Sequence, residues 1–272
     1  LDTFLTIAYA IASGSIAFAF VQAFTQSGQR PDRVFFFGAV LLALLIHVLG
    51  QLLILSGAYA LAPHLVGVDS VIKMALGPAV FFYTRALVSP EKPRFGGFDW
   101  MWLLGPVLII LVWIPFGALS AQEKLALVDP ATRNPVHFRM AIFTCTASLV
   151  VFIGFTTIYL VAALRLQIGH RRTMMEQFAN IERKSLDWLR AILLVFAMAW
   201  LFFAIKQVLW VTGTSIPTFN LVLAYTETFA IAAFAYLGLQ QPALFFEQAS
   251  NAQPRRPILS DERMSRTSAK LI

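Results

Sequence analysis

The chain alternates long apolar stretches with short polar segments. Seven stretches consist mainly of apolar residues, and few charged side chains interrupt them. A helix of about 20 apolar residues crosses the roughly 30 Å of a bilayer's hydrocarbon, and each stretch approaches or exceeds that length. We therefore predict an all-α, polytopic membrane protein, a bundle of seven transmembrane helices. The predicted spans are 3–25, 34–56, 67–88, 101–119, 138–164, 187–212 and 217–239.

The composition also indicates that most of this chain lies in a lipid bilayer. Charged residues make up 13% and apolar residues 58%, whereas a soluble domain has about 25% charged residues. The segments between the spans are too short to bury a core, because chains below about 40 residues rarely fold alone. Any site must therefore lie in the bundle or on a further domain. We divide the chain into a sensor or anchor domain, 1–239, and a cytoplasmic linker, 240–272.

The basic residues favour one orientation of the helices. If the first helix starts outside, 16 of the 21 lysines and arginines lie in the cytoplasmic segments 26–33, 85–100, 165–190 and 240–272. Because basic residues are retained on the cytoplasmic side, we predict the N-terminus outside and the C-terminus in the cytoplasm. The same bias and attraction to anionic lipid explain most of the net charge of +7 without nucleic-acid binding by these residues.

The first apolar stretch is predicted to be a span rather than a signal peptide. No basic segment precedes it and the chain opens with Leu1, so we also expect the chain to belong to a longer protein. A stripe of small residues along this span lets another helix approach closely. We expect packing within the bundle, with a dimer seam as the alternative. The stripe is Ala8, Ala12, Ser15, Ala19 and Ala23.

Ionisable residues within the predicted spans are candidate site residues, because a charge in the bilayer is costly. Glu227 lies in the outer half of the seventh span, and Lys206 lies near the outer end of the sixth. We expect the two side chains to be within reach of each other. A Glu227–Lys206 pair either joins two helices or forms part of a ligand-sensing site.

Two further pairs share a helix face at a spacing of four residues. His47 and Gln51 lie in the second span, and Asp69 and Lys73 lie at the start of the third. His47 is either a neutral histidine bonded between helices or a proton sensor. Asp69 and Lys73 form either an ion pair at a helix end or part of a binding site.

The sequence contains no catalytic, cofactor or metal motif. His64, Glu123, Asp129 and His137 lack metal-ligand spacing, and the single Cys145 makes neither an intramolecular disulfide nor a zinc site. Metalloprotease, nucleophile-elbow and phosphate-loop motifs are absent, and the last span has no lysine for a retinal Schiff base. We predict a protein that is not an enzyme and that binds no cofactor or metal.

The cytoplasmic segments are predicted to contain further helix. Apolar residues in 165–190 follow helical spacing, so we expect the fifth and sixth spans to continue into the cytoplasm and to transmit movement. Anchoring at the lipid surface is the alternative. In the tail, Ser260 favours a new helix start. The candidate signal-transmitting residues are Phe178, Glu182, Trp188 and Arg190.

Three stretches in register with the spans carry a family resemblance. The third span contains Leu76-Gly77-Pro78, Phe81-Phe82-Tyr83 and Arg85-Ala86-Leu87. Residues 178–190 start the sixth span, and Tyr236-Leu237-Gly238-Leu239-Gln240-Gln241-Pro242 ends the seventh. From about residue 67 to its end, the chain resembles the bacterial membrane-bound transcriptional regulators of the AraC type. Those regulators usually have Gly-Leu-x-Gln-Pro in the last motif.

The resemblance implies a sensor or anchor in the bacterial inner membrane, acting through a helix-turn-helix domain beyond this chain. The implied partners are the lipid bilayer, a second copy in a homodimer, promoter DNA through that domain, and a small-molecule or envelope signal. The tail from Leu259 resembles the family's linker, although Arg255-Arg256-Pro257 replaces a tyrosine and a basic pair. The alternatives are a seven-helix receptor with another output domain, such as a kinase or cyclase, and a small-molecule transporter or channel.

Overall fold

A computed structural model describes residues 2–25, 30–65, 67–89, 96–177, 187–211 and 217–240. Among these residues the regular structure is helical, without strands. The prediction of seven apolar helices is confirmed, and most of their ends agree with the predicted ends within a few residues. The segments long and apolar enough to cross a membrane are Thr3–Thr25, Pro31–Leu55, Pro63–Val88, Asp99–Gly117, Pro135–His170, Trp188–Leu209 and Leu221–Leu239.

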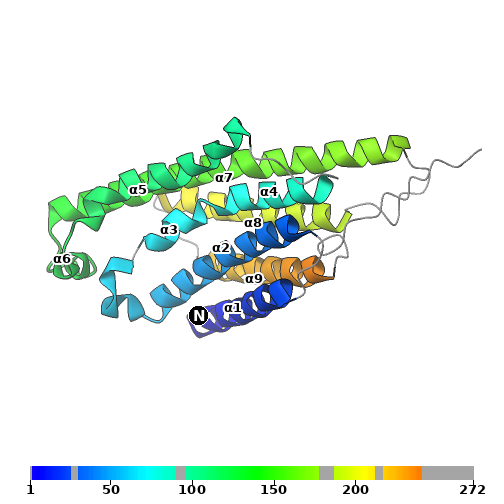
Figure 1. Cartoon of the computed structure of the whole chain (residues 1–272). Helices are drawn as coiled ribbons and strands as arrows, with labels where there is room; N and C mark the ends of the chain where they lie inside the picture. Colours follow the sequence, from blue (N-terminus) through cyan, green and yellow to red (C-terminus); the bar gives the residue numbers. More distant parts are fainter. Residues whose placement is uncertain are drawn as a thin grey trace, which may run out of the picture.

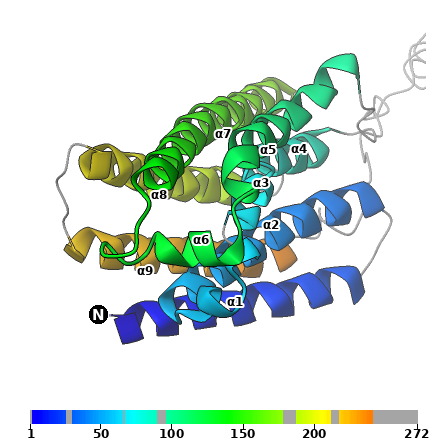
Figure 2. The ribbon, with the colours of Figure 1, turned by 90° about the vertical axis from the view of Figure 1, so that its left-hand side faces the viewer.

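The helices lie side by side and alternate in direction along one bundle (Figure 1). A short helix, α6, lies at one end, which we call the α6 end (Figure 2). The long elements are α1 (Asp2–Thr25), α2 (Pro31–Leu55), α4 (Leu76–Val88), α5 (Leu104–Gly117), α7 (Pro135–Gln177), α8 (Asp187–Val211) and α9 (Pro217–Leu239). The short ones are η1 (Ala58–Leu61), η2 (Pro63–Leu65), α3 (Val68–Lys73), η3 (Gly97–Leu103) and α6 (Ala121–Ala126).

The buried face of helix α1 is rich in alanine, although it also contains Leu5, Tyr9 and Ile16. It packs against α2 and α9, where small residues let the backbones approach closely. Packing within the bundle is therefore confirmed for the four alanines of the predicted stripe. Ser15 does not belong to it: it is only half-buried, and the neighbouring Ile16 is fully buried. The buried alanines are Ala8, Ala12, Ala19 and Ala23.

The third predicted span is two helices, not one. A turn at Met74 and Ala75 separates α3 from α4. Pro78 explains the break, because it has no N–H for the Met74 carbonyl and its ring would clash with that carbonyl in a continuous helix. Gly77 lets α4 lie close to α7, since a Cβ here would be 3.1 Å from Thr156 Cα. The glycine and proline of the third-span motif thus have structural roles.

Helix α7 is the longest helix and projects past the others at the end opposite α6 (Figure 1). Its 43 residues extend about 64 Å at 1.5 Å per residue, roughly twice the thickness of the hydrocarbon. The predicted continuation of the fifth span is confirmed as far as Gln177. The predicted Phe178 and Glu182, and the tail from 241 to 272, lie outside the described residues.

The core is densest in the half of the bundle away from α6. Phe37 of α2, Tyr83 of α4 and Phe234 of α9 are at most 1% exposed. Their ring centroids lie 5.2 to 5.7 Å apart, a geometry in which each aromatic pair contributes about 0.5–1.5 kcal/mol. This aromatic cluster fixes three helices against one another.

Candidate functional site

A cavity of about 620 Å³ lies among α2, α3, α5, α7, α8 and the start of α9. It occupies the half of the bundle nearer α6, because its α2 and α8 residues lie toward the ends of those helices that face α6. Small-molecule sites typically enclose about 300–1,000 Å³. We call it the polar cavity. Its polar lining residues are His47, Gln51, Ser70, Lys73, Ser148, Lys206 and Gln207.

Four of the six predicted intramembrane residues line the polar cavity, namely His47, Gln51, Lys73 and Lys206. Asp69 Oδ2 lies 2.5 Å from Lys73 Nζ, so the predicted pair within α3 is present. This contact orients Lys73 and offsets its charge. These four candidate residues, which come from the second, third and sixth predicted spans, therefore line one cavity.

The predicted Glu227–Lys206 pair does not form. Glu227 Oε2 accepts a hydrogen bond of 3.3 Å from the Tyr9 hydroxyl and lies 3.6 Å from His47 Nε2. Depth along the spans suggested the pair, but the direction of a side chain depends on how its helix is rotated. Helix α9 turns the carboxylate toward Tyr9 of α1 and His47 of α2, so Glu227 joins these three helices and does not reach salt-bridge distance of Lys206.

Several polar atoms around the polar cavity lack a protein partner. Among the described residues, Lys206 has no carboxylate within salt-bridge distance, although it lies within electrostatic range of Glu227. Ser148 Oγ, His47 Nδ1 and Trp113 Nε1 are buried without a hydrogen-bond partner in the described part of the chain. Leaving such a group unsatisfied costs about 1–3 kcal/mol, and native structures retain few. Other buried polar atoms without a partner among the described residues, such as Tyr83 Oη and Trp188 Nε1, lie away from this cavity, so the distinguishing feature of its wall is that three such atoms occur together with Lys206.

A second cavity of about 100 Å³ adjoins the polar one. The two share the lining residues His47, Lys73, Phe152 and Phe203. Most of the remaining wall is apolar, and we call this space the apolar cavity. Beyond the shared residues, its polar lining residues are Thr156 and Glu227, and its apolar ones include Leu44, Leu76, Val80, Leu160, Phe196, Ala199, Trp200, Ala230 and Ile231.

No feature of the sequence singles out Ser70, Ser148 and Gln207, which line the cavity, or Tyr9, which lies beside Glu227. Hydroxyl and amide side chains are ordinary in membrane helices, where they bond between helices or to their own backbone. Only their convergence on one cavity sets them apart, and that convergence depends on how the helices are rotated and packed.

The opposite end of the bundle holds a buried network that we call the arginine end. Arg33 is 4% exposed. Its Nε donates to the Ala86 carbonyl at 2.9 Å, and its Nη2 donates to the Ser89 carbonyl at 3.3 Å. Carbonyls at the end of a helix lack intrahelical partners. The guanidinium of Arg33 therefore caps the end of α4 and ties it to α2.

Two ion pairs complete the arginine end. Arg85 pairs with Asp99 through bonds of 2.6 and 3.2 Å and lies over the Phe82 ring, 4.9 Å from its centroid. Arg30, 2% exposed, pairs with Asp32 at 3.0 Å. From the sequence, these arginines were used only to predict the orientation of the helices. The structure shows that they also hold α2, α4 and η3 in place.

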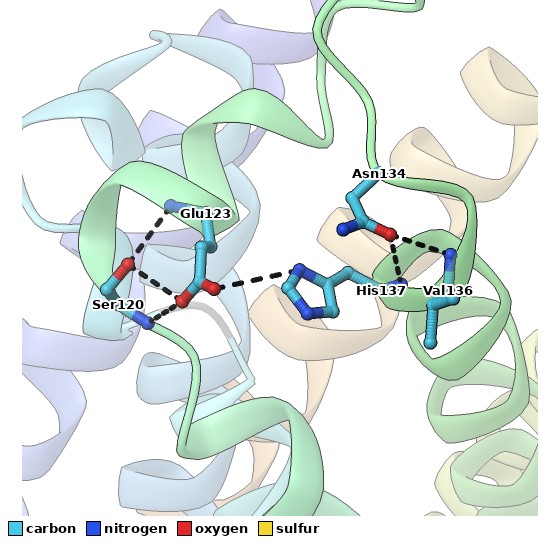
Figure 3. Close-up of polar contacts among 5 residues, drawn as sticks. All are labelled: Ser120, Glu123, Asn134, Val136 and His137. Carbon is cyan, nitrogen blue, oxygen red and sulfur yellow. Dashed lines mark hydrogen bonds and ion pairs between the residues drawn. The ribbon is translucent and has the colours of Figure 1, made fainter.

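Helix α6 is held by a capping box (Figure 3). Ser120 N donates to Glu123 Oε2 at 2.8 Å, and Ser120 Oγ accepts from Glu123 N at 3.3 Å. The backbone and then the hydroxyl hydrogen bond from Ser120 lower the pKa of Glu123. Glu123 Oε1 also lies 3.8 Å from His137 Nδ1, at the start of α7. In the described residues, no three His, Cys, Asp or Glu side chains gather as metal ligands.

The two described residues of the predicted transmission segment differ in environment. Trp188 is half-buried and packs against the core, whereas Arg190 is exposed at the start of α8. Trp188 is therefore placed to couple the start of α8 to the packing of the bundle. A role for either residue in transmission stays a prediction.

The fold and its cavities have no matching relative: no protein-family model, curated protein or solved structure matches the chain. The resemblance to AraC-type regulators therefore rests on the sequence motifs alone. Function is inferred from the seven helices, the two cavities and the arginine end.

Proposed function

We propose that this chain is the membrane-embedded sensor region of an AraC-type transcriptional regulator. The polar cavity binds a small ligand, and α7 carries the resulting change to an output domain in the cytoplasm. The observation that carries the proposal is the polar cavity, whose wall combines Lys206 with three buried polar atoms that lack a hydrogen-bond partner among the described residues. A bundle that served only as an anchor has no need of such groups, since each one lowers stability.

The outer surface of the bundle supports insertion in a bilayer. Phe18, Phe143 and Phe229 are 67 to 69% exposed on three different helices, as expected where lipid replaces water around a membrane helix. The distribution of basic residues supports the α6 end as the outer one. In this orientation the polar cavity lies nearer the outside, and the projecting part of α7 lies in the cytoplasm.

Cysteine labelling in intact cells tests the orientation. Val128→Cys places a thiol at an exposed site between α6 and α7, and Arg172→Cys places one at an exposed site in the projecting part of α7. Both are made with Cys145→Ala. A membrane-impermeant maleimide is expected to label the first variant and not the second. Labelling of only Arg172→Cys would invert the proposed orientation.

Helix α7 connects the cavity with the cytoplasm in one continuous element. Ser148 and Phe152 line the polar cavity, and the same helix runs on to Gln177. A ligand that changes the contacts of these residues biases the position of the whole helix, as rigid elements transmit shifts between alternative packings. Signalling then requires only that the ligand binds one arrangement of α7 better than another.

A cavity-filling variant tests transmission without knowledge of the ligand. Ser148→Phe adds bulk inside the polar cavity, and the matched control Val150→Phe adds bulk on the outer face of the same helix, where Val150 is 66% exposed. Hydrogen exchange of the intact chain in lipid nanodiscs is measured over residues 165–177. A sensor is expected to show altered exchange there in Ser148→Phe only. Equal exchange in both variants and the wild type would indicate that the bundle only anchors the protein in the membrane.

The genomic sequence beyond Ile272 tests the proposed output. A helix-turn-helix domain supports the regulator, a kinase or cyclase domain supports a different receptor, and an immediate stop codon removes the regulator proposal. The packed arginine end favours a receptor over a transporter, because a transporter must open its site to both sides of the membrane. Uptake of a solute into proteoliposomes, lost in Glu227→Gln, would favour the transporter.

A further inference from the structure

We propose that the ligand of the polar cavity is an amphiphilic anion: a carboxylate or similar head group held between Lys73 and Lys206, with an alkyl chain in the apolar cavity. This inference rests on the proposed function and names the class of ligand. It is drawn from the charge of one cavity, the apolarity of the next and the wall that they share.

The wall of the polar cavity favours a negative head group. Lys73, Lys206 and His47 line it, and no aspartate or glutamate does. Two carboxylates lie close to this wall, but both contact other side chains: Asp69 binds Lys73, and Glu227, which lines the adjoining apolar cavity, lies beside Tyr9 and His47. Lys206 therefore lacks a close counter-ion among the described residues. In a surrounding of low dielectric, an anion beside that ammonium group is strongly favoured.

Neutral groups in the same wall match the hydrogen-bonding needs of an anionic oxygen. Ser148 is 8% exposed, and its Oγ is buried without a partner in the described part of the chain. Trp113 Nε1 is a second such group, and it can only donate. Hydrogen bonds to an ionised acceptor are roughly twice as strong as neutral ones. A head group that accepts from these donors satisfies groups that the protein leaves unbonded.

The apolar cavity favours a chain on that head group. Phe152 and Phe203 belong to the walls of both cavities. Their rings contact each other edge to face, with centroids 5.8 Å apart, so a chain passes along this pair and enters a space lined mainly by aliphatic and aromatic side chains. Burial of each CH₂ raises the affinity about fourfold. A medium-length alkyl chain therefore adds affinity that a small polar anion lacks.

The single cysteine supplies an assay that needs no engineered label. Cys145 lines the polar cavity, and the chain has no other cysteine. The intact chain in lipid nanodiscs is treated with N-ethylmaleimide, and adduct formation is followed by mass spectrometry. Three probes separate head from chain: decanoate has both, decanol has only the chain and acetate has only the head. Decanoate is expected to slow alkylation of Cys145 at concentrations where decanol and acetate do not.

Substitutions test whether protection of Cys145 by decanoate depends on the polar cavity. Lys206→Met removes the cation without a close counter-ion, and the matched control Arg139→Met removes an exposed cation that does not line the cavity. Lys206→Met is expected to raise the decanoate concentration for half-protection by about tenfold or more, since a hydrogen bond to a charged group contributes about 1.5–3 kcal/mol. Lys206→Arg keeps the charge and is expected to retain most of the protection. Arg139→Met is expected to behave as wild type.

The outcomes separate this inference from the proposed function. Equal protection by decanol, or unchanged protection in Lys206→Met, would overturn the anionic head, and equal protection by acetate would overturn the alkyl chain. Absence of protection by any probe would overturn the amphiphilic ligand altogether. None of these results affects the hydrogen-exchange comparison of Ser148→Phe with Val150→Phe, on which the sensor itself depends.

Discussion

The polar cavity and the arginine end use similar residues in opposite ways. Both place cations inside the bundle, but Arg33 and Arg85 bind carbonyls and a carboxylate, whereas Lys206 has no carboxylate within salt-bridge distance among the described residues. Among the described residues, buried hydroxyl and ring N–H groups without partners occur in both halves, so the contrast between the two ends rests on the cations. A buried charge whose partners are missing therefore indicates a functional site, whereas a buried charge that is fully paired indicates a structural role.

The difference follows from what each end has to do. A charge that fastens helices must be fully paired, because breaking a buried pair costs about 3–5 kcal/mol. A ligand site retains unpaired groups at the expense of stability, so that the ligand supplies the missing contacts. Substitutions at the two ends are therefore expected to differ in size and even in sign.

The largest effect is expected for Arg33→Met. The substitution leaves the Ala86 and Ser89 carbonyls at the end of α4 without their guanidinium donor. We expect the free energy of unfolding to fall by about 2–3 kcal/mol, measured by denaturant titration in detergent micelles. Arg139→Met, at an exposed position, is the control and is expected to change it by less than about 0.5 kcal/mol. Equal stability of the two variants would show that the arginine end does not fasten the bundle.

A smaller effect is expected in the coupling of Arg85 with Asp99. Their two bonds join α4 to η3, so a double-mutant cycle with Arg85→Met and Asp99→Asn is expected to give about 1–2 kcal/mol. The Lys73–Asp69 pair within α3 is the comparison, with about 0.3–0.5 kcal/mol expected for a pair within one helix. A larger coupling in α3 would reverse the assignment of structural and functional ends.

Lys206→Met is expected to differ in sign from Arg33→Met. Because Lys206 lacks a close counter-ion, its replacement removes a desolvated charge without breaking an ion pair. The free energy of unfolding is expected to stay unchanged or to rise by up to about 1 kcal/mol. The same titration measures it. A loss as large as that of Arg33→Met would mean that Lys206 is structural.

The smallest effect is expected at α6, outside both regions. The bonds from Ser120 hold the pKa of Glu123 below its ordinary value of 4.5. A carboxyl with a lowered pKa in the folded state stabilises that state above its ordinary pKa, and the contribution is lost as the pH falls through the folded value. Hydrogen exchange over 120–126 is therefore expected to be slower in the wild type than in Glu123→Gln above pH 4.5, and the difference is expected to disappear as the pH falls through the lowered pKa of Glu123. A difference that persisted in acid would exclude the capping carboxylate as its cause.

The spans were predictable because long apolar stretches leave few alternatives to a membrane helix. The alanines of α1 were predictable too, since small residues in register indicate close packing. The break in the third span was also within reach of the sequence, because Pro78 cannot continue a helix through Met74. The Glu227–Lys206 pair was not, because depth along two spans does not fix which way each side chain points.

The sequence by itself determined the number of spans, their approximate ends and the set of ionisable residues inside them, because these depend on composition and on spacing along one helix. Only the tertiary structure decided which of those residues meet. The rotation and packing of the helices bring His47, Gln51, Lys73 and Lys206 to one cavity and turn Glu227 toward Tyr9. Contacts between helices join residues that are far apart in the chain. The spacing of residues within one helix therefore cannot predict these contacts.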